Sequence, residues 1–164
     1  MVVFSMKWVV SLFLIFAVLA SAMAAPSAIF IVRHAEKASS TDKDPDLAEA
    51  GRARAESLAK MLKDANITAI YATEFKRTQQ TAAPVAKALG LELTIAPAKD
   101  TATLAAKLRD LRGNALVVGH GNTITDLIKA LGVGTPVNIA ETDYDNLFVV
   151  VLDQKPQLIQ LHYR

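Results

Sequence analysis

Short apolar runs alternate along the chain with longer stretches in which apolar residues recur every three or four positions. The runs predict buried strands, because a strand covered on both faces is apolar at consecutive positions. The longer stretches predict helices with one buried face. The predicted strands are Ala28–Val32, Ile67–Tyr71, Glu92–Ile95, Ala115–Val118, Leu147–Leu152 and Gln157–His162.

The helices are expected in the stretches between the first five strands. Asp46 is the expected cap of the first helix, with Glu49 in a capping-box position and an end near Lys63. The next three are expected over about Glu74–Leu89, from a Thr101 cap to Gly113, and from an Asn122 cap to Gly132. Pro84 lies inside the second helix and predicts a kink or an early break.

Strands that alternate with helices predict βαβ units with right-handed crossovers. The fold class is therefore α/β, a three-layer arrangement with a mostly parallel sheet and helices on both faces. The last two strands, joined by Asp153–Pro156, predict a C-terminal β-hairpin with at least one antiparallel strand. Gly132–Asn146 has no regular period and is expected to be a long loop that is either functional or mobile.

The first residues have the pattern of an export signal. Lys7 precedes an apolar run from Trp8 to Ala20, and Ala22-Met23-Ala24 fits a cleavage signal. We expect a signal peptide over residues 1–24, one domain over residues 25–164, and a protein that is periplasmic or secreted. The alternative is an uncleaved leader that holds the protein at a membrane.

Charge and cysteine content exclude nucleic acid as an expected partner and a disulfide as a structural feature. The 164-residue chain has a formal net charge of +2, too small for the basic field that nucleic-acid binding requires, so nucleic acid is not expected as a partner. The chain has no cysteine and therefore no disulfide.

Two histidines and two arginines follow the ends of predicted parallel strands. Arg33 and His34 come directly after the first strand, Arg77 follows the second, and His120 follows the fourth. The carboxyl ends of parallel strands meet at one edge of the sheet, which is where open α/β sheets bind ligands. Arg77 also falls in a first helical turn, where a cation is unfavourable unless an anion is bound there.

This residue set fits phosphoryl chemistry. Guanidinium groups bind phosphate oxygens in pairs, and a neutral imidazole can attack phosphorus to give a phosphohistidine that water later hydrolyses. A second imidazole can hold the same phosphate. No His, Cys and Asp cluster has metal-ligand spacing, so neither a metal nor another cofactor is expected.

The motifs resemble those of the histidine phosphatase superfamily, the phosphoglycerate-mutase-like group, and its small exported members most of all. The resemblance rests on the signature Arg33-His34-Ala35-Glu36, the stretch Thr73-Glu74-Phe75-Lys76-Arg77-Thr78-Gln79-Gln80-Thr81-Ala82, the turn Gly119-His120-Gly121-Asn122-Thr123 and the stretch Leu47-Ala48-Glu49-Ala50-Gly51. It spans roughly residues 29–151.

The resemblance implies roles for these residues. It makes His34 the nucleophile, His120 the second pocket histidine, and Arg33 and Arg77 the phosphate ligands. Asn122 and Thr73 are implied as further substrate contacts. Gly121 stands where one branch of the family has its proton-donating aspartate, so the general acid stays open, with Glu141, Asp143 and Asp100 as the candidates.

The sequence thus predicts a metal-independent phosphomonoester hydrolase that acts on a phosphorylated small molecule through a phosphohistidine on His34. Two alternatives remain at this point. One is a protein phosphohistidine phosphatase, since some short members of the family act on phosphorylated histidine. The other is a non-catalytic phospholigand-binding module, which would have no need of a nucleophile.

Overall fold

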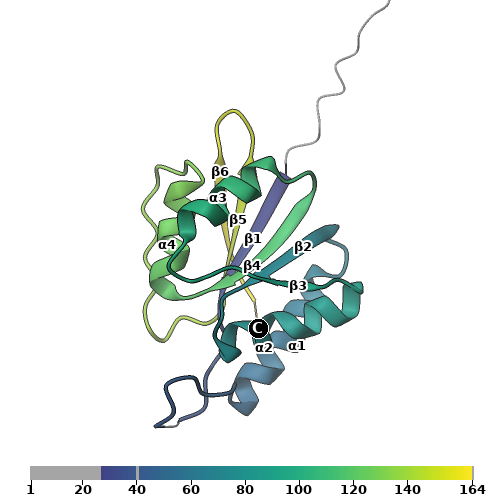
Figure 1. Cartoon of the computed structure of the whole chain (residues 1–164), viewed down its shortest axis with the longest axis vertical. Coiled ribbons are helices and arrows are strands. Elements are labelled where there is room, and N and C mark those ends of the chain that lie inside the picture. Colours follow the sequence, from purple (N-terminus) through teal and green to yellow (C-terminus); the bar gives the residue numbers. More distant parts are fainter. Residues whose placement is uncertain (1–26, 40, 164) are drawn as a thin grey trace, which may run out of the picture.

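A computed structural model describes residues 27–39 and 41–163, which form one mixed sheet with helices on both faces (Figure 1). The expected α/β class, the mostly parallel sheet and the C-terminal hairpin are confirmed. The expected signal peptide over residues 1–24 lies outside the described residues. Within the described part, no helix has both the length and the apolar character needed to cross a bilayer.

The sheet has the strand order β3-β2-β4-β1-β5-β6. Strands β1 to β4 run parallel, whereas β5 is antiparallel to both β1 and β6. The strands are β1 (Ser27–Arg33), β2 (Ile67–Ala72), β3 (Leu93–Ile95), β4 (Asn114–Gly119), β5 (Asn146–Leu152) and β6 (Gln157–His162). Because β1 and β4 are central neighbours, the residues that follow them leave the sheet side by side at its carboxyl edge.

Four helices cover the two faces of the sheet in pairs (Figure 1). They are α1 (Glu49–Leu62), α2 (Lys76–Leu89), α3 (Thr101–Asp110) and α4 (Gly121–Ala130). Alternate residues of each buried strand contact different pairs: Val32 packs in the core with α1 and α2, whereas Ile31 packs in the core with α3 and α4. Both faces of the central strands are thus buried, which explains their uninterrupted apolar sequence.

Three predicted helix caps are wrong. Asp46 does not cap α1, because its side chain accepts a hydrogen bond from Gln80 and a bridge between Lys37 and Leu47 keeps the chain extended there. Glu49 accordingly lies in the first turn. Thr101 is the first residue of α3, and the cap is Asp100, whose carboxylate accepts from the Thr103 amide.

The third wrong cap is Asn122, which lies inside the first turn of α4. The cap position belongs to His120, whose N–H donates to Thr123 Oγ1 at 3.0 Å. The helix begins early because β4 continues to Gly119 and leaves no loop. By contrast, α2 continues through Pro84 without the early break considered above, and it ends as expected at Leu89, before Gly90 with its φ of 65°.

The segment after β1 is fixed by contacts with both α1 and α2. The amide of Ala35 donates to Thr81 Oγ1, and the amide of Ala48 donates to the carbonyl of Glu36. Gly51 allows α1 to approach this closely, because a Cβ there would collide with the Glu36 carbonyl oxygen. The Glu36 carboxylate also pairs with Arg54 of α1 at 2.6 Å. The residues that follow β1 are therefore held rigidly.

Candidate active site

His34 leaves the end of β1 in a fixed orientation. Its amide donates to the Gly119 carbonyl at 2.9 Å, and only 5 % of the residue is exposed. The ring Nδ1 lies 2.8 Å from the Ala35 carbonyl oxygen. Because a carbonyl oxygen only accepts, Nδ1 carries the proton, and the neutral ring keeps its free electron pair on Nε2.

The electrostatic surroundings keep His34 neutral. Burial lowers the pKa of His34 to about 4, against the opposing effect of the Ala35 hydrogen bond. The positive charge of Arg33, the His120 ring and the charge of Arg77 lower this pKa further. An unprotonated imidazole is the form that can act as a nucleophile.

Arg33 is held by the loop that follows α4. One terminal nitrogen donates to the carbonyl of Ala140 at 2.9 Å and to that of Glu141 at 2.6 Å, and the guanidinium carbon lies 4.6 Å from the centre of the Tyr144 ring. The Nε atom is buried and has no hydrogen-bond partner in the described part of the protein. The long loop therefore contributes directly to the site, and Arg33 retains an unused donor.

Arg77 lies in the first turn of α2 and reaches toward His120. Its guanidinium carbon lies 4.5 Å from the centre of the Phe75 ring, and one terminal nitrogen lies 3.4 Å from His120 Nδ1. The other terminal nitrogen lies 3.6 Å from Asp44 Oδ1. A carboxylate of the chain itself thus supplies an anion near this helix terminus. Sequence reasoning missed Asp44, because it lies in a loop far from Arg77 along the chain.

His120 is held from both ring nitrogens. Since a guanidinium only donates, Nδ1 accepts from Arg77, and Nε2 donates to Thr73 Oγ1 at 3.0 Å. Thr73 is itself buried and lies 2.8 Å, oxygen to oxygen, from Thr78. Burial lowers the pKa of His120 to about 4, helped by the charge of Arg77 and partly opposed by that of Glu74.

These side chains meet at one pocket of about 430 Å³. The His34 and His120 rings lie with their centres 5.4 Å apart and their planes at 63°. The pocket is lined by Arg33, His34, Arg77, His120, Gly121, Asn122, Ile139 and Glu141. The structure thus brings together five of the six residues expected to catalyse or bind, with Thr73 placed behind His120.

The three candidate general acids lie in different surroundings in the structure. Glu141 lines the pocket. Asp143 lies in the same loop, but its carboxylate accepts from the Ala140 amide. Asp100 caps α3 and lines a different cavity, together with Thr94 and Lys107. Among the described residues that line the pocket, Glu141 is the only carboxylic acid.

The polar groups of the pocket suit an oxyanion better than a metal ion. Two guanidinium groups face two imidazoles that are kept neutral, and the N-terminal end of α4 begins at Gly121 beside them. Within residues 27–39 and 41–163, no group of three or more His, Cys, Asp or Glu side chains is arranged to hold a metal. The arrangement can bind a phosphate and present Nε2 of His34 to it.

Comparison with known proteins agrees with this geometry. The family model described as histidine phosphatase superfamily (branch 1) matches residues 29–100, which include the segments of Arg33, His34 and Arg77. None of the curated proteins matches the sequence significantly.

Several solved structures share the fold. The protein histidine phosphatase SixA complexed with tungstate is 23% identical, with a TM-score of 0.69 over 82% of this chain and 96% of that chain. The alpha-ribazole phosphatase from Shigella flexneri is 17% identical, with a TM-score of 0.68 over 82% of this chain and 96% of that one. A mycobacterial glucosyl-3-phosphoglycerate phosphatase is 15% identical, with a TM-score of 0.65 over 85% and 100%.

These likenesses concern the fold, whereas the family model matches the sequence segments that carry Arg33, His34 and Arg77. The order of the motifs, the geometry of the pocket and the match of the family model agree. Residues 29–100 of the chain thus match the histidine phosphatase superfamily, and the fold agrees with that match.

Proposed function

We propose that the protein is a metal-independent phosphomonoester hydrolase that forms a phosphohistidine on His34. The observation that carries the proposal is the hydrogen bond from His34 Nδ1 to the Ala35 carbonyl. It fixes the tautomer, so that the electron pair on Nε2 belongs to a neutral ring beside two guanidinium groups.

The reaction divides into two displacements at phosphorus. In the first, the electron pair of Nε2 forms a bond to phosphorus while the ester oxygen leaves with the electrons of the P–O bond. In the second, a water molecule attacks phosphorus, the N–P bond breaks, and His34 regains its electron pair as phosphate is released. Arg33 and Arg77 stabilise the charge on the phosphoryl oxygens in both steps, and the buried Nε of Arg33 gains a partner.

The leaving oxygen needs a proton, and we assign Glu141 as the acid that donates it; in the second step the Glu141 carboxylate takes a proton back from the attacking water. The assignment rests on Glu141 being the one carboxylic acid among the described residues that line the pocket. We assign His120 as a further phosphate ligand: Nε2 stays bonded to Thr73, and Nδ1, which accepts from Arg77 in the structure, donates to the phosphate once it is protonated. A bound phosphate raises the proton affinity of its imidazole, because an anion favours the cationic form.

A protein phosphohistidine phosphatase is the second candidate. The observation that favours it is that Glu141 is the one carboxylic acid among the described residues that line the pocket. A phosphohistidine that is protonated on its other ring nitrogen releases a neutral imidazole, so this leaving group needs no acid from the enzyme. The structural likeness to SixA, a protein histidine phosphatase by its description, fits the same possibility. Export of the chain would separate it from cytoplasmic phosphoproteins, which favours phosphorylated small molecules.

The experiment is a hydrolysis assay on the chain from Ala25 onward with phosphorylated sugars, nucleotides, phytate and phosphohistidine peptides. Release of phosphate that persists in EDTA supports the proposal, and release that requires an added divalent ion contradicts it. We expect His34→Ala to lose more than about nine-tenths of the wild-type hydrolysis rate, because the substitution removes the nucleophile. The matched control is His162→Ala, which removes an exposed imidazole of β6 that is paired with Asp145.

We also propose that the chain is exported and that cleavage after Ala24 gives the mature protein. The support is the sequence of the first residues, with Lys7, the apolar run and the Ala22-Met23-Ala24 signal. Expression of the full chain followed by N-terminal sequencing tests this proposal. A mature protein that begins at Ala25 in the exported fraction is the expected result, and an intact leader on a membrane-bound protein would overturn it.

A further inference from the structure

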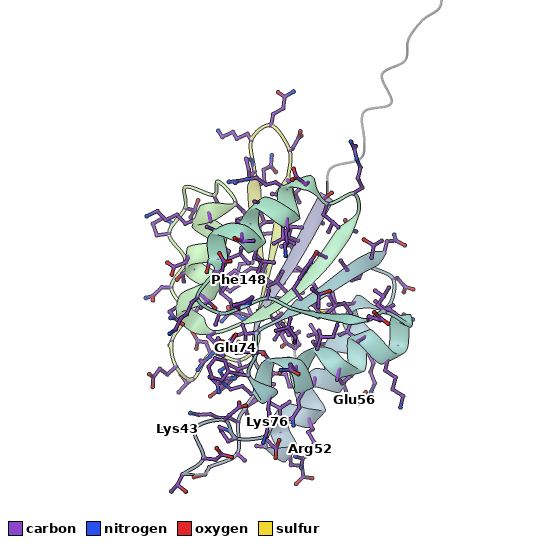
Figure 2. All side chains as sticks on the ribbon, in the orientation of Figure 1. Lys43, Arg52, Glu56, Glu74, Lys76 and Phe148 are labelled. Atoms are coloured by element: carbon purple, nitrogen blue, oxygen red, sulfur yellow. The ribbon has the colours of Figure 1, made fainter. Side chains whose placement is uncertain are left out.

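The loop between β1 and α1 brings Asp44 to the start of α2. Figure 2 shows this loop with Lys43 on it, below the sheet and next to Lys76, the first residue of α2. Both carboxylate oxygens of Asp44 accept from the Lys76 amide, at 3.0 and 3.2 Å. The formal cap residue of α2, Phe75, makes no side-chain cap hydrogen bond. Asp44 therefore caps α2 from a different segment of the chain.

The same carboxylate lies against Arg77. Its Oδ1 atom is 3.6 Å from one terminal nitrogen of Arg77, while the other terminal nitrogen lies 3.4 Å from His120. The Phe75 ring packs against the guanidinium at 4.5 Å. The guanidinium is thus held at both terminal nitrogens and on its face, with Asp44 opposite the pocket histidine.

The loop that carries Asp44 is itself fixed at two points. The Gln80 side chain of α2 donates to Asp46 and accepts from the Leu47 amide at 2.8 Å. The Ala38 amide donates to the Asp46 carbonyl, which connects the loop to the segment after His34. The position of Asp44 relative to Arg77 is therefore set by the same elements that set the position of His34.

We propose that Asp44 is a positioning residue for Arg77. Asp44 holds the Arg77 guanidinium in the orientation that the transition state of phosphoryl transfer requires. The inference rests on the proposed function. Asp44 lies outside the residues that line the pocket, so it acts on substrate through Arg77. A long arginine side chain held on one side only would lose part of its alignment, and alignment matters more for the transition state than for simple anion binding.

Asp44→Asn isolates this role. An asparagine oxygen still accepts from the Lys76 amide, so the cap of α2 is retained, while the charge opposite Arg77 is removed. Asp46→Asn is the matched control, because it removes a carboxylate charge on the same loop and keeps the acceptor for Gln80. Each variant is made with Arg77 present and in the Arg77→Ala background, which gives a double-mutant cycle.

Two readouts are measured on the four proteins of the cycle and on the control. The first is kcat/KM, and the second is the Kd for vanadate by isothermal titration calorimetry. We expect Asp44→Asn to lower kcat/KM about tenfold, mainly through kcat, and to weaken vanadate binding by a similar factor. In the Arg77→Ala background the same substitution is expected to change the vanadate Kd by less than about twofold. Asp46→Asn is expected to behave as wild type.

An equal loss with and without Arg77 would overturn the inference, because Asp44 would then act on the loop or the fold alone. A vanadate Kd unchanged by Asp44→Asn would also overturn it. Failure of the proposed function is a separate outcome. A wild-type protein that binds vanadate but hydrolyses no substrate contradicts the function, while the calorimetric cycle still decides whether Asp44 and Arg77 are coupled.

Discussion

The Nδ1 atom of His34 lies 2.8 Å from the carbonyl oxygen of Ala35, the next residue in the chain. This contact stabilises the tautomer that is protonated on Nδ1 and leaves the free electron pair of the ring on Nε2. Burial and the nearby positive charges keep the same ring neutral, with a pKa of about 4. Under the proposed function, the fold therefore supplies a nucleophile without help from a separate base.

Arg77 is predicted to bind the phosphoryl group through two parallel hydrogen bonds. Arg77→Ala should weaken vanadate binding strongly, and Arg77→Lys should restore only part of it, because an ammonium cannot make the two-pronged contact. Calorimetric titration with vanadate measures both effects. Equal vanadate affinity in Arg77→Ala and wild type would show that Arg77 does not bind the anion and would contradict its role as a phosphate ligand.

The buried neutral His34 makes stability depend on pH. Its pKa is about 4 in the folded chain and 6.5 in the unfolded one, so the unfolded state binds more protons between these values. The contribution of the neutral His34 ring to the free energy of unfolding is fully present above pH 6.5 and is lost as the pH falls toward 4. We expect wild type to lose on the order of 2 kcal/mol more stability than His34→Asn between pH 7 and pH 5. Urea unfolding at the two pH values measures this, and equal losses would show that His34 is not held neutral.

Tyr163 offers a test of packing away from the pocket. The side chain is 2 % exposed, and its hydroxyl is buried without a hydrogen-bond partner among the described residues. An unpaired buried hydroxyl costs free energy, so Tyr163→Phe is expected to leave stability unchanged or to raise it by up to about 1 kcal/mol. Tyr163→Ala should cost about 3 kcal/mol, because it leaves a cavity. Chemical denaturation compares the two, and a marked loss in Tyr163→Phe would reveal a partner for the hydroxyl.

The assignment of Glu141 as general acid predicts a dependence on the leaving group. Glu141→Gln should slow the hydrolysis of alkyl phosphates by about a hundredfold, since their leaving oxygen needs a proton. Hydrolysis of p-nitrophenyl phosphate should change much less, because its leaving group is stable as an anion. Asp143→Asn is the control in the same loop. A uniform loss on both substrates would assign Glu141 to binding.

The strands and the position of the pocket could be predicted because each depends on a local pattern. Val32 and Val118 end apolar runs that are buried on both faces, and the residues after them meet because β1 and β4 are parallel neighbours. A parallel strand that is covered on both faces is apolar at consecutive positions, so it can be recognised from the sequence alone. His34, Arg77 and His120 each follow the end of a predicted parallel strand, and this position predicted that they lie together at the carboxyl edge of the sheet.

What could not be predicted depends on contacts between distant segments. Asp46 has the spacing of a helix cap, yet its side chain binds Gln80 of α2, and the helix begins later. Asp44 caps α2 although it precedes that helix by more than thirty residues. Cap rules use neighbours in sequence, whereas these carboxylates satisfy donors that only tertiary packing brings near.

The most direct measurement of the central claim is rapid quenching of the protein mixed with p-nitrophenyl phosphate carrying labelled phosphorus. The account predicts labelled protein in which the phosphate is lost in acid and retained in alkali, and which maps to His34 by peptide mass spectrometry. His34→Ala should carry no label, and His162→Ala should carry as much as wild type. Steady hydrolysis by a wild-type protein that never becomes labelled, or a label on another residue, would contradict the account.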